Sequence, residues 1–328
     1  MPLLITGSIA TDHLMSFPGR FSDSLVSDAL EKVSLSFLVD DLVVRRGGCA
    51  ANICFGLGML GLAPVLVGAV GEDFLEYRSW LDRHNVDCES VHVSGTRHTA
   101  RFVCTTDKTM AQIASFYAGA MSEAREIELR PILQRVGPAD YVLIGPNDPE
   151  GMLRHTQECR TRGYRFVADP SQQLAWGDGA MIRQLVDGAE ILISNEYESS
   201  LIIHKTGWSH DEVLARVGLW VTTLSAQGVR VEGRGIETFR VPAVPGVVPV
   251  EPTGVGDAFR AGFLAALAWD LSLERAAELG CLLAAYVVEQ IGTQEYTLSR
   301  EAFLARAEMA YGAQAADDFA PHLRTFLP

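Results

Sequence analysis

Short apolar segments alternate with helical patterns along most of this chain of 328 residues. The apolar segments have the length of buried strands and occupy residues 3–9, 65–70, 141–144, 166–168, 191–193 and 220–224. Helical patterns separate most of them, as at residues 72–83, 149–162 and 179–186. Such alternation is typical of a mostly parallel sheet with helices on both faces. We therefore expect one domain over residues 1–328, built as a three-layer α/β/α sandwich.

Two regions interrupt this alternation. Residues 32–46 and 98–116 are rich in β-forming side chains and show no helical pattern between their halves. We expect antiparallel strands there, forming a small second sheet that acts as a lid, with lid segments at approximately 11–46 and 95–117. The last third of the chain returns to helices, predicted at 257–269, 273–291 and 299–309.

The composition argues against several classes of partner. A formal net charge of −14 repels nucleic acid and anionic membrane surfaces, so we expect neither. The six cysteines include no C-x-x-C pair, which favours reduced thiols and a cytoplasmic protein. Residues 47–71 are uncharged and long enough to span a bilayer. Their seven glycines and Pro64 instead favour a buried helix over 50–60 followed by a short strand.

One glycine pattern invites a misleading interpretation. Gly56-Leu-Gly-Met-Leu-Gly61 matches the dinucleotide-binding pattern G-x-G-x-x-G. That pattern binds a pyrophosphate where the glycines follow a strand and open a helix. Here they close a predicted helix and precede a strand. We therefore interpret them as positions of close helix packing and expect no nicotinamide cofactor.

The strongest candidate site is Glu251-Pro-Thr-Gly-Val-Gly-Asp-Ala-Phe259, which leads into an apolar helix. Gly254, Val255 and Gly256 lie where a loop enters that helix, so unpaired backbone N–H groups converge there and form an anion site. Asp257 follows in the first turn, where it can accept a hydroxyl proton while the anion site holds a phosphoryl group. The residues alone leave a second interpretation open, in which Asp257 is an ordinary acidic residue at a helix N-terminus.

These residues resemble the ribokinase-like (PfkB) family of sugar and nucleoside kinases. The G-V-G-D sequence ending at Asp257 is similar to its C-terminal signature, and Gly47-Gly48 followed by Asn52 is similar to its first. The family's N-x-x-E motif is present from Asn195 to Glu198. Further segments resemble the bacterial adenosine kinase branch, at residues 6–14, 32–39, 98–102, 112–116, 169–173 and 292–295. The resemblance implies an ATP-dependent kinase that converts adenosine and ATP into AMP and ADP, with Asp257 as catalytic base.

The resemblance also implies the acceptor-binding residues. Asp12 and Asn52 would hold the ribose diol, with Gly48 allowing close approach to the backbone. Phe102 and Phe116 would sandwich the purine, since aromatic side chains bind bases through their faces. Further polar contacts would come from Ser8, Ser36, Gln172 and Gln173. The residues alone also allow Asp12 in a surface turn, Asn52 as a helix cap and the two phenylalanines in a hairpin core.

The same resemblance implies the residues that bind ATP and magnesium. ATP would contact Asn195 and the loop made of Thr223, Leu224, Ser225, Ala226, Gln227 and Gly228. Glu198 would organise Mg²⁺ through metal-bound water, although Asn195 and Glu198 also fit a simple helix cap. Two positions depart from the family pattern. Ser225 replaces the first glycine of the ATP loop, so we expect weak ATP binding. Glu251 replaces an aspartate of the family, a position that the resemblance links to a monovalent cation.

Alternative functions remain open at this point. A kinase for ribose, fructose or another sugar would belong to the same family, but a sugar offers no flat base to the aromatic pair. A nucleoside-binding protein without catalysis would not need both Asp257 and the N-x-x-E motif. Finally, the exposed edge of the predicted lid suggests a homodimer by analogy with the fold.

Overall fold

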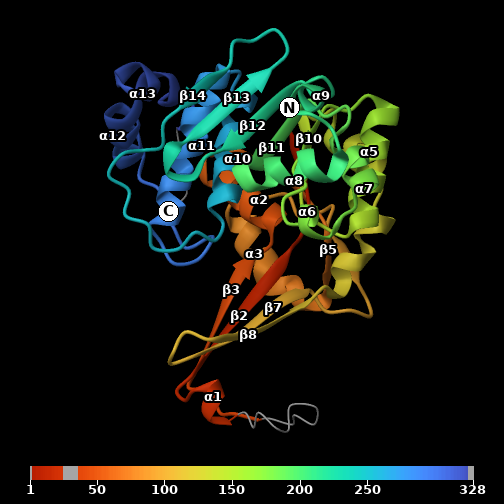
Figure 1. Cartoon of the computed structure of the whole chain (residues 1–328), viewed down its shortest axis with the longest axis vertical. Helices are drawn as coiled ribbons and strands as arrows, with labels where there is room; N and C mark the ends of the chain where they lie inside the picture. The colour runs from red at the N-terminus through yellow and green to blue at the C-terminus, as the bar shows by residue number, and fades with distance from the viewer. Residues whose placement is uncertain (1, 25–35, 324–328) are drawn as a thin grey trace.

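The computed structural model describes residues 2–24 and 36–323. Its centre is an eight-stranded sheet with the order β14-β13-β12-β11-β10-β9-β1-β4 (Figure 1). The strands are β1 (Leu3–Thr6), β4 (Val65–Val67), β9 (Tyr141–Ile144), β10 (Phe166–Ala168), β11 (Ile191–Asn195), β12 (Leu219–Thr223), β13 (Val229–Gly233) and β14 (Phe239–Val241). The six strands from β12 to β4 pair in parallel, whereas β13 and β14 extend the sheet as an antiparallel edge.

This architecture confirms the predicted fold class, a mostly parallel sheet with helices and a small second sheet. The antiparallel edge was missed because β13 and β14 contain Arg230, Glu232 and Arg240, which break the apolar runs used to identify the other strands. Two predicted strands are also shorter than expected. The segment predicted at 3–9 ends at Thr6, and the segment predicted at 65–70 divides at Gly68 into β4 and β5 (Ala69–Gly71).

Helices cover both faces of the sheet. Successive residues of a strand point to opposite faces, so Leu3 and Ile5 belong to one hydrophobic core while Leu4 belongs to the other. The first core is covered by α2 (Cys49–Met59), α3 (Leu75–Arg83), α10 (Val255–Ala268), α11 (Leu273–Val288), α12 (Arg300–Tyr311) and α13 (Ala313–Phe319). The second is covered by α4 (Leu129–Val136), α5 (Pro149–Arg162), α7 (Gly179–Val186), α8 (Glu196–Thr206) and α9 (His210–Leu214). The helices predicted at 149–162 and 179–186 have the predicted bounds.

The lid is a four-stranded sheet that projects from the body (Figure 1). Its order is β3-β2-β7-β8, formed by β3 (Asp41–Gly47), β2 (Ala10–Phe17), β7 (Ala100–Asp107) and β8 (Gln112–Tyr117). The outer pairs are antiparallel, as predicted, but the central pair β2–β7 is parallel. Parallel pairing arises because both strands leave the body in the same direction. Part of the predicted first lid segment, residues 25–35, lies outside the described residues.

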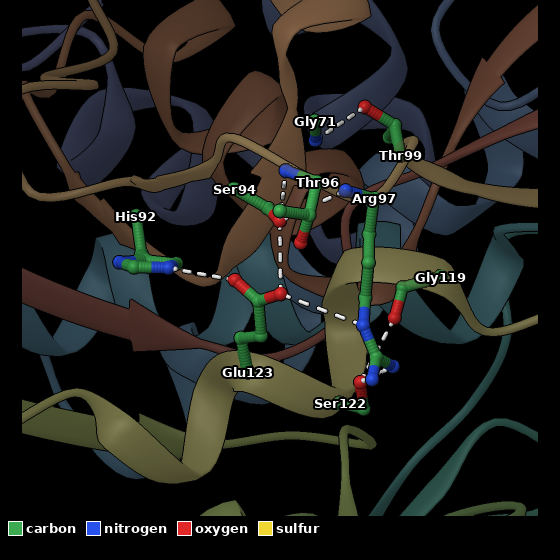
Figure 2. A network of polar contacts seen from close by, with 9 residues as sticks. All are labelled: Gly71, His92, Ser94, Thr96, Arg97, Thr99, Gly119, Ser122 and Glu123. Atoms are coloured by element: carbon green, nitrogen blue, oxygen red, sulfur yellow. Dashed lines mark hydrogen bonds and ion pairs between the residues drawn. The ribbon is translucent and has the colours of Figure 1, made fainter.

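A polar network anchors the second lid segment to the body (Figure 2). Glu123 lies on the 3₁₀ helix η3 (Gly119–Glu126) and accepts a hydrogen bond of 2.8 Å from Ser94 Oγ, at the end of β6 (His92–Ser94). His92 Nε2 lies 2.9 Å from the other carboxylate oxygen, and Arg97 Nε lies 3.6 Å from Glu123. Arg97 also donates to Ser122 Oγ at 2.6 Å. These contacts join the segment before β7 to the segment after β8.

Short helical elements complete the chain. They are α1 (Phe21–Ser24), η2 (Glu72–Phe74), α6 (Gln173–Trp176) and η4 (Ser225–Gln227). Among the described residues, none of the helices combines the length and the apolar character needed to cross a bilayer. The uncharged segment 47–71 folds as predicted into a buried helix, α2, and a buried strand, β4.

The glycines at 56 and 58 serve helix packing, in agreement with the sequence-based interpretation. A methyl group on Gly56 would lie 2.7 Å from Cβ of Ala261 on α10, and one on Gly58 would overlap the carbonyl oxygen of His84. Real Cβ atoms are not found so close to other heavy atoms. α2 can therefore approach its neighbours only without side chains at these positions.

We expect Gly58→Ala to lower the free energy of unfolding by ~1–3 kcal/mol, the usual cost of overpacking a core. Alanine favours a helix interior over glycine by about 1 kcal/mol, so destabilisation would show that the clash dominates. Denaturant unfolding measures this change. Gly95→Ala is the matched control, because a methyl group there meets nothing within 4 Å. An unchanged stability of Gly58→Ala would show that this helix contact is loose.

Candidate active site

The candidate residues gather at the carboxyl ends of the parallel strands. Ser8 follows β1, Asn147 follows β9 and Asp169 follows β10, while Asn195 and Thr223 are the last residues of β11 and β12. The last two are also paired in register. Ligands of open α/β sheets bind at this edge. The fold thus brings together residues that are far apart in the sequence.

The N-terminus of α10 is where the sequence predicts an anion site. Gly254 is its N-cap with φ of +78°, a left-handed conformation that favours glycine. A side chain at that position would also collide with Thr293. No side chain caps this helix end, so its first N–H groups remain available for an anion. Asp257 is the third residue of the helix, beside these groups.

Asp257 faces a second helix across the site. Asn52 on α2 donates from Nδ2 to Asp257 Oδ2 at 2.9 Å, a contact between residues 205 positions apart. Burial raises the pKa of Asp257, while Arg260, Asn52 and Cys49 act in the opposite direction. The carboxylate is therefore partly desolvated and yet held by polar partners, which suits a proton acceptor. Asn52 thus contacts Asp257 directly, a contact that the sequence did not predict, and its predicted contact with the ribose stays a prediction.

A buried ion pair lies behind Asp257, and sequence reasoning gave it no role. Arg260 Nη2 is 2.5 Å from Asp169 Oδ1, and both side chains are almost fully buried. Burial raises the pKa of Asp169 to about 6, against the effect of the guanidinium. A methyl group on Gly256 would lie 2.8 Å from Arg260 Nη1, so Gly256 leaves space for this cation. In the sequence, the sign of this ion pair was Arg260 itself, a charged residue that lies among the apolar residues of the helix.

Asn147 is another residue without a predicted role. It is 1% exposed, and its Nδ2 has no hydrogen-bond partner among the described residues. Its backbone oxygen accepts from Gln173 Nε2 at 2.8 Å, which ties it to the loop after Asp169. A buried amide nitrogen without a partner is costly. Asn147 is therefore a further candidate for ligand contact.

The lid contributes one row of side chains across its strands. In register, Arg45 on β3 lies beside Asp12 on β2, Asp12 beside Phe102 on β7, and Phe102 beside Phe116 on β8. Residues in one such row point to the same face of a sheet. Arg45 Nη1 lies 3.3 Å from Glu251, directly before the α10 loop. This face of the lid is therefore turned toward the start of α10.

The two phenylalanines are side by side rather than face to face. They form a directly opposed cross-strand pair, so a base would lie against both rings and not between them. Phe116 is 54% exposed and Phe102 is half-buried, which argues against a hairpin core. Asp12 is packed against Gly47, and burial together with the nearby charge of Glu251 raises its pKa to about 6. Asp12 is thus a partly buried carboxylate and not part of a surface turn.

The remaining predicted acceptor contacts differ in position. Ser8 Oγ accepts from the backbone N–H of Cys49 at 3.0 Å, and Gln172 Nε2 lies 3.6 Å from Cys49 Sγ, so both lie near the start of α2. Gly48 has φ of +94°, and a side chain there would collide with the backbone of residues 8–10. The backbone around Gly48 therefore requires glycine at this position whether or not a ligand binds.

Ser36 is not brought to this site. It is exposed and precedes Phe37, whose ring packs 4.8 Å from that of Phe17 at the outer end of β2. The distance from Asp12 to Phe17 along a strand is about 17 Å. In the described part of the predicted extended segment, residues 36–46, the strand begins only at Asp41, which leaves Ser36 at the far end of the lid.

The candidate nucleotide loop lies beside Asn195. Residues 224–228 connect β12 and β13 in a tight turn, in which Leu224 N donates to Gly228 O at 2.7 Å. Ser225 has φ of +52°, the left-handed region that glycine adopts without strain. The family's glycine is therefore explained by backbone conformation. Ser225 adopts that conformation at the cost of backbone strain.

Asn195 and Glu198 form a complete capping box on α8. Asn195 Oδ1 accepts from Glu198 N, and Glu198 Oε2 accepts from Asn195 N, both at 2.8 Å. Glu198 Oε1 also accepts from Ser171 Oγ at 3.3 Å. The described residues contain no group of three or more acidic, histidine or cysteine side chains arranged to hold a metal. A magnesium ion would therefore fit here through its waters and the nucleotide phosphates, with Glu198 as an outer partner.

Comparisons with known proteins find similar kinases. The sequence profile of the pfkB family carbohydrate kinases matches residues 10–300. The chain is 30% identical to a nucleoside kinase of Methanothermobacter thermautotrophicus, over 89% of this chain and 91% of that protein. Among solved structures, nucleoside kinase of Burkholderia thailandensis in ligand-free form has 34% identity and a TM-score of 0.85, covering 93% of this chain and all of that chain. Its complex with inosine has 33% identity and a TM-score of 0.81, covering 94% and 99%.

We expect Ser225→Gly to raise the free energy of unfolding by about 0.5–1 kcal/mol, because glycine removes the strain of the positive φ but adds chain entropy. Since the backbone already has the conformation that glycine would adopt, any fall in KM for ATP would come from losing the hydroxyl group. Denaturant unfolding and steady-state kinetics measure the two effects. Ala226→Gly, in the same turn, should destabilise the protein. A destabilised Ser225→Gly variant would contradict the strain argument.

Proposed function

Because the chain belongs to the pfkB family of carbohydrate kinases, we propose that it transfers the γ-phosphoryl group of ATP to the 5′-hydroxyl of a purine nucleoside. Adenosine is the proposed acceptor, in keeping with the branch-level resemblance, and the products are AMP and ADP. The observation that carries this proposal is the lid row of Asp12, Phe102 and Phe116 on the face turned toward α10. It offers a carboxylate for the ribose diol and, beside it, two aromatic surfaces for the base.

The chemistry follows from the geometry around α10. Asp257 takes the proton of the 5′-hydroxyl as its oxygen attacks the γ-phosphorus in line. The bond from that phosphorus to the β–γ bridging oxygen breaks, and ADP leaves with the electron pair. The N–H groups at Gly254, Val255 and Gly256 hold the oxygens of the transferred group, where negative charge is concentrated. Arg260 adds a buried positive charge behind them.

The nucleotide would lie along the edges of β11 and β12. Asn195, which is paired in register with Thr223, and the turn at 223–228 would contact its phosphates and base. Magnesium, when bound, offsets phosphate charge and orients the γ-phosphoryl group. Glu251 is already paired with Arg45 and with the backbone N–H of Gly292 at 2.8 Å. A monovalent cation near Glu251 would therefore share this carboxylate with a protein cation.

Inosine is a second candidate acceptor. A nucleoside kinase of Burkholderia thailandensis that is 33% identical to this chain was solved in complex with inosine. Adenosine and inosine share the ribose and differ at C6 of the purine. The lid row would contact the ribose and the faces of the base, and neither distinguishes these two nucleosides. A sugar kinase of the same family is the remaining alternative.

We also propose a homodimer that pairs through the lid. The face opposite the Asp12 row carries Leu42, Val44, Ile113 and Tyr117, each 46–54% exposed. β8 is an edge strand whose residues are all exposed. An apolar face beside an open strand edge favours association with another sheet. Analytical ultracentrifugation tests this proposal, and a monomer at micromolar concentration would contradict it.

A coupled assay of ADP release tests the acceptor. Adenosine, inosine, guanosine, ribose and fructose are compared at equal concentration with saturating ATP and Mg²⁺. The proposal expects the highest kcat/KM with a purine nucleoside. Preference for ribose or fructose would refute it while leaving the kinase assignment intact.

We expect Asp257→Asn to retain the fold and lose ~10²–10⁴-fold in kcat, the usual contribution of a positioned base. Asparagine keeps the size of the side chain but cannot take the proton. Glu274→Gln is the matched control, since Glu274 is an exposed acid in the first turn of α11. Steady-state kinetics with thermal melting measures both variants. If Asp257→Asn keeps most of its turnover, Asp257 is only an acid at a helix N-terminus.

We expect Phe102→Ala and Phe116→Ala each to weaken nucleoside binding by ~1–3 kcal/mol, the cost of losing a base–aromatic stack. Binding of free ribose should barely change. Val103→Ala on the opposite face of β7 is the control. Isothermal titration calorimetry measures the affinities. Unchanged nucleoside affinity in both folded variants would remove the structural reason for preferring a nucleoside over a sugar.

A further inference from the structure

Asn52 meets the catalytic carboxylate with a defined end of its amide. Its Nδ2 lies 2.9 Å from Asp257 Oδ2. An amide has a donor end and an acceptor end, so the reversed amide would place its oxygen against a carboxylate oxygen. That arrangement favours Asp257 only when it is protonated and unable to act as a base. The direction of the Asn52 amide therefore matters for the reaction.

The direction of the Asn52 amide is set by residues outside α2 and α10. Asn52 Oδ1 accepts from Gln294 Nε2 at 2.9 Å and lies 3.0 Å from Thr293 Oγ1. The one hydroxyl hydrogen of Thr293 is shared between Asn52 Oδ1 and the backbone oxygen of Arg46, which also lies 3.0 Å away. Gln294 is therefore the stronger donor. Gln294 is 1% exposed, and its own Oε1 accepts from Trp80 Nε1 at 3.0 Å. An indole N–H is a donor only. Gln294 must therefore turn its oxygen to Trp80 and its NH₂ group to Asn52.

These hydrogen bonds form a series in which each side chain donates to the next one. It passes from Trp80 to Gln294, then to Asn52, and ends at Asp257. Hydrogen bonds arranged in one direction polarise one another. The indole itself is held by a stacked ring, Phe55, with centroids 5.8 Å apart, and by the guanidinium of Arg46, 4.3 Å from its ring. The series thus begins at a fixed donor, the Trp80 indole, and ends at the proposed catalytic base, Asp257.

We propose that Trp80, Gln294 and Thr293 are positioning residues that fix the direction of the Asn52 amide, so that its NH₂ group faces Asp257. Their role rests on the proposed function only in that Asp257 is the base. Loss of the two donors to Asn52 Oδ1 frees the amide to reverse. A reversed amide withdraws a hydrogen bond from the ionised carboxylate and raises its pKa.

Other charged and titratable groups face Asp257 and remain unchanged in the test below. They are Arg260 on the same helix, Asp169 after β10 and Cys49 at the start of α2. The test substitutions are all neutral, so they add no charge near Asp257. A shift in its titration then reports on hydrogen bonding.

The test is the titration of Asp257 in the free enzyme, followed by ¹³C NMR of carboxyl-labelled aspartate and assigned with Asp257→Asn. In the double variant Thr293→Val, Gln294→Met we expect the midpoint to rise by about one pH unit, the usual effect of losing a hydrogen bond to a charged group. Each single variant should move it less, because one donor still holds the amide. The acidic limb of kcat should move in parallel with the midpoint.

Tyr77→Phe is the matched control. Tyr77 Oη accepts from Gln294 Nε2 at 2.6 Å, so its loss removes a partner of Gln294 without affecting the direction of the series. We expect no shift in this variant. An unchanged midpoint in the double variant, or an equal shift in Tyr77→Phe, would overturn the proposal.

If thermal melting shows that the double variant does not fold, Trp80→Phe takes its place. Phenylalanine keeps the stacked ring and removes only the donor, so a smaller rise is expected and no rise would overturn the proposal. Because the titration is measured without substrate, its outcome is independent of the acceptor. Failure to phosphorylate adenosine and inosine would refute the proposed function and leave this inference standing.

Discussion

Helices α2 and α10 approach so closely that a methyl group on Gly56 would lie 2.7 Å from Cβ of Ala261. This approach brings the first turn of α2 against the first turn of α10, and with it Asn52 against Asp257. Larger residues at these positions would push the helices apart and separate the two side chains. The glycines that match the dinucleotide-binding pattern thus affect the candidate active site indirectly, because they allow α2 and α10 to pack closely.

Charge is the second constraint on the site. Asp169 and Asp257 lie near Arg260, whose pKa is lowered by burial but raised overall by attraction to these carboxylates and to Glu198. Removing one member of a buried ion pair is expensive, at about 3–5 kcal/mol, because the other charge is left unpaired. The pair therefore fixes the loop after β10 to α10.

The lid adds what the body lacks. The body carries the proposed anion site and the proposed base, while the aromatic and acidic side chains proposed for nucleoside recognition come from one row across β2, β7 and β8. The polar network around Glu123 ties the second lid segment to the body. The opposite face of the lid carries exposed apolar side chains, so its two faces differ in character.

Periodicity and a few glycines in the sequence determined the fold class, the helices at 149–162 and 179–186, and the carboxylate at the start of α10. These features are local, since strand and helix periods and a loop entering a helix are visible within about fifteen residues. The sequence could not place Asn52 against Asp257, pair Arg260 with Asp169, or show that Phe102 and Phe116 lie side by side. Nor could it separate Ser36 from the site, because that depends on where β3 begins. Each of these was decided by tertiary structure, for contacts between residues 91 or 205 positions apart depend on helix packing and strand register, which no local pattern records.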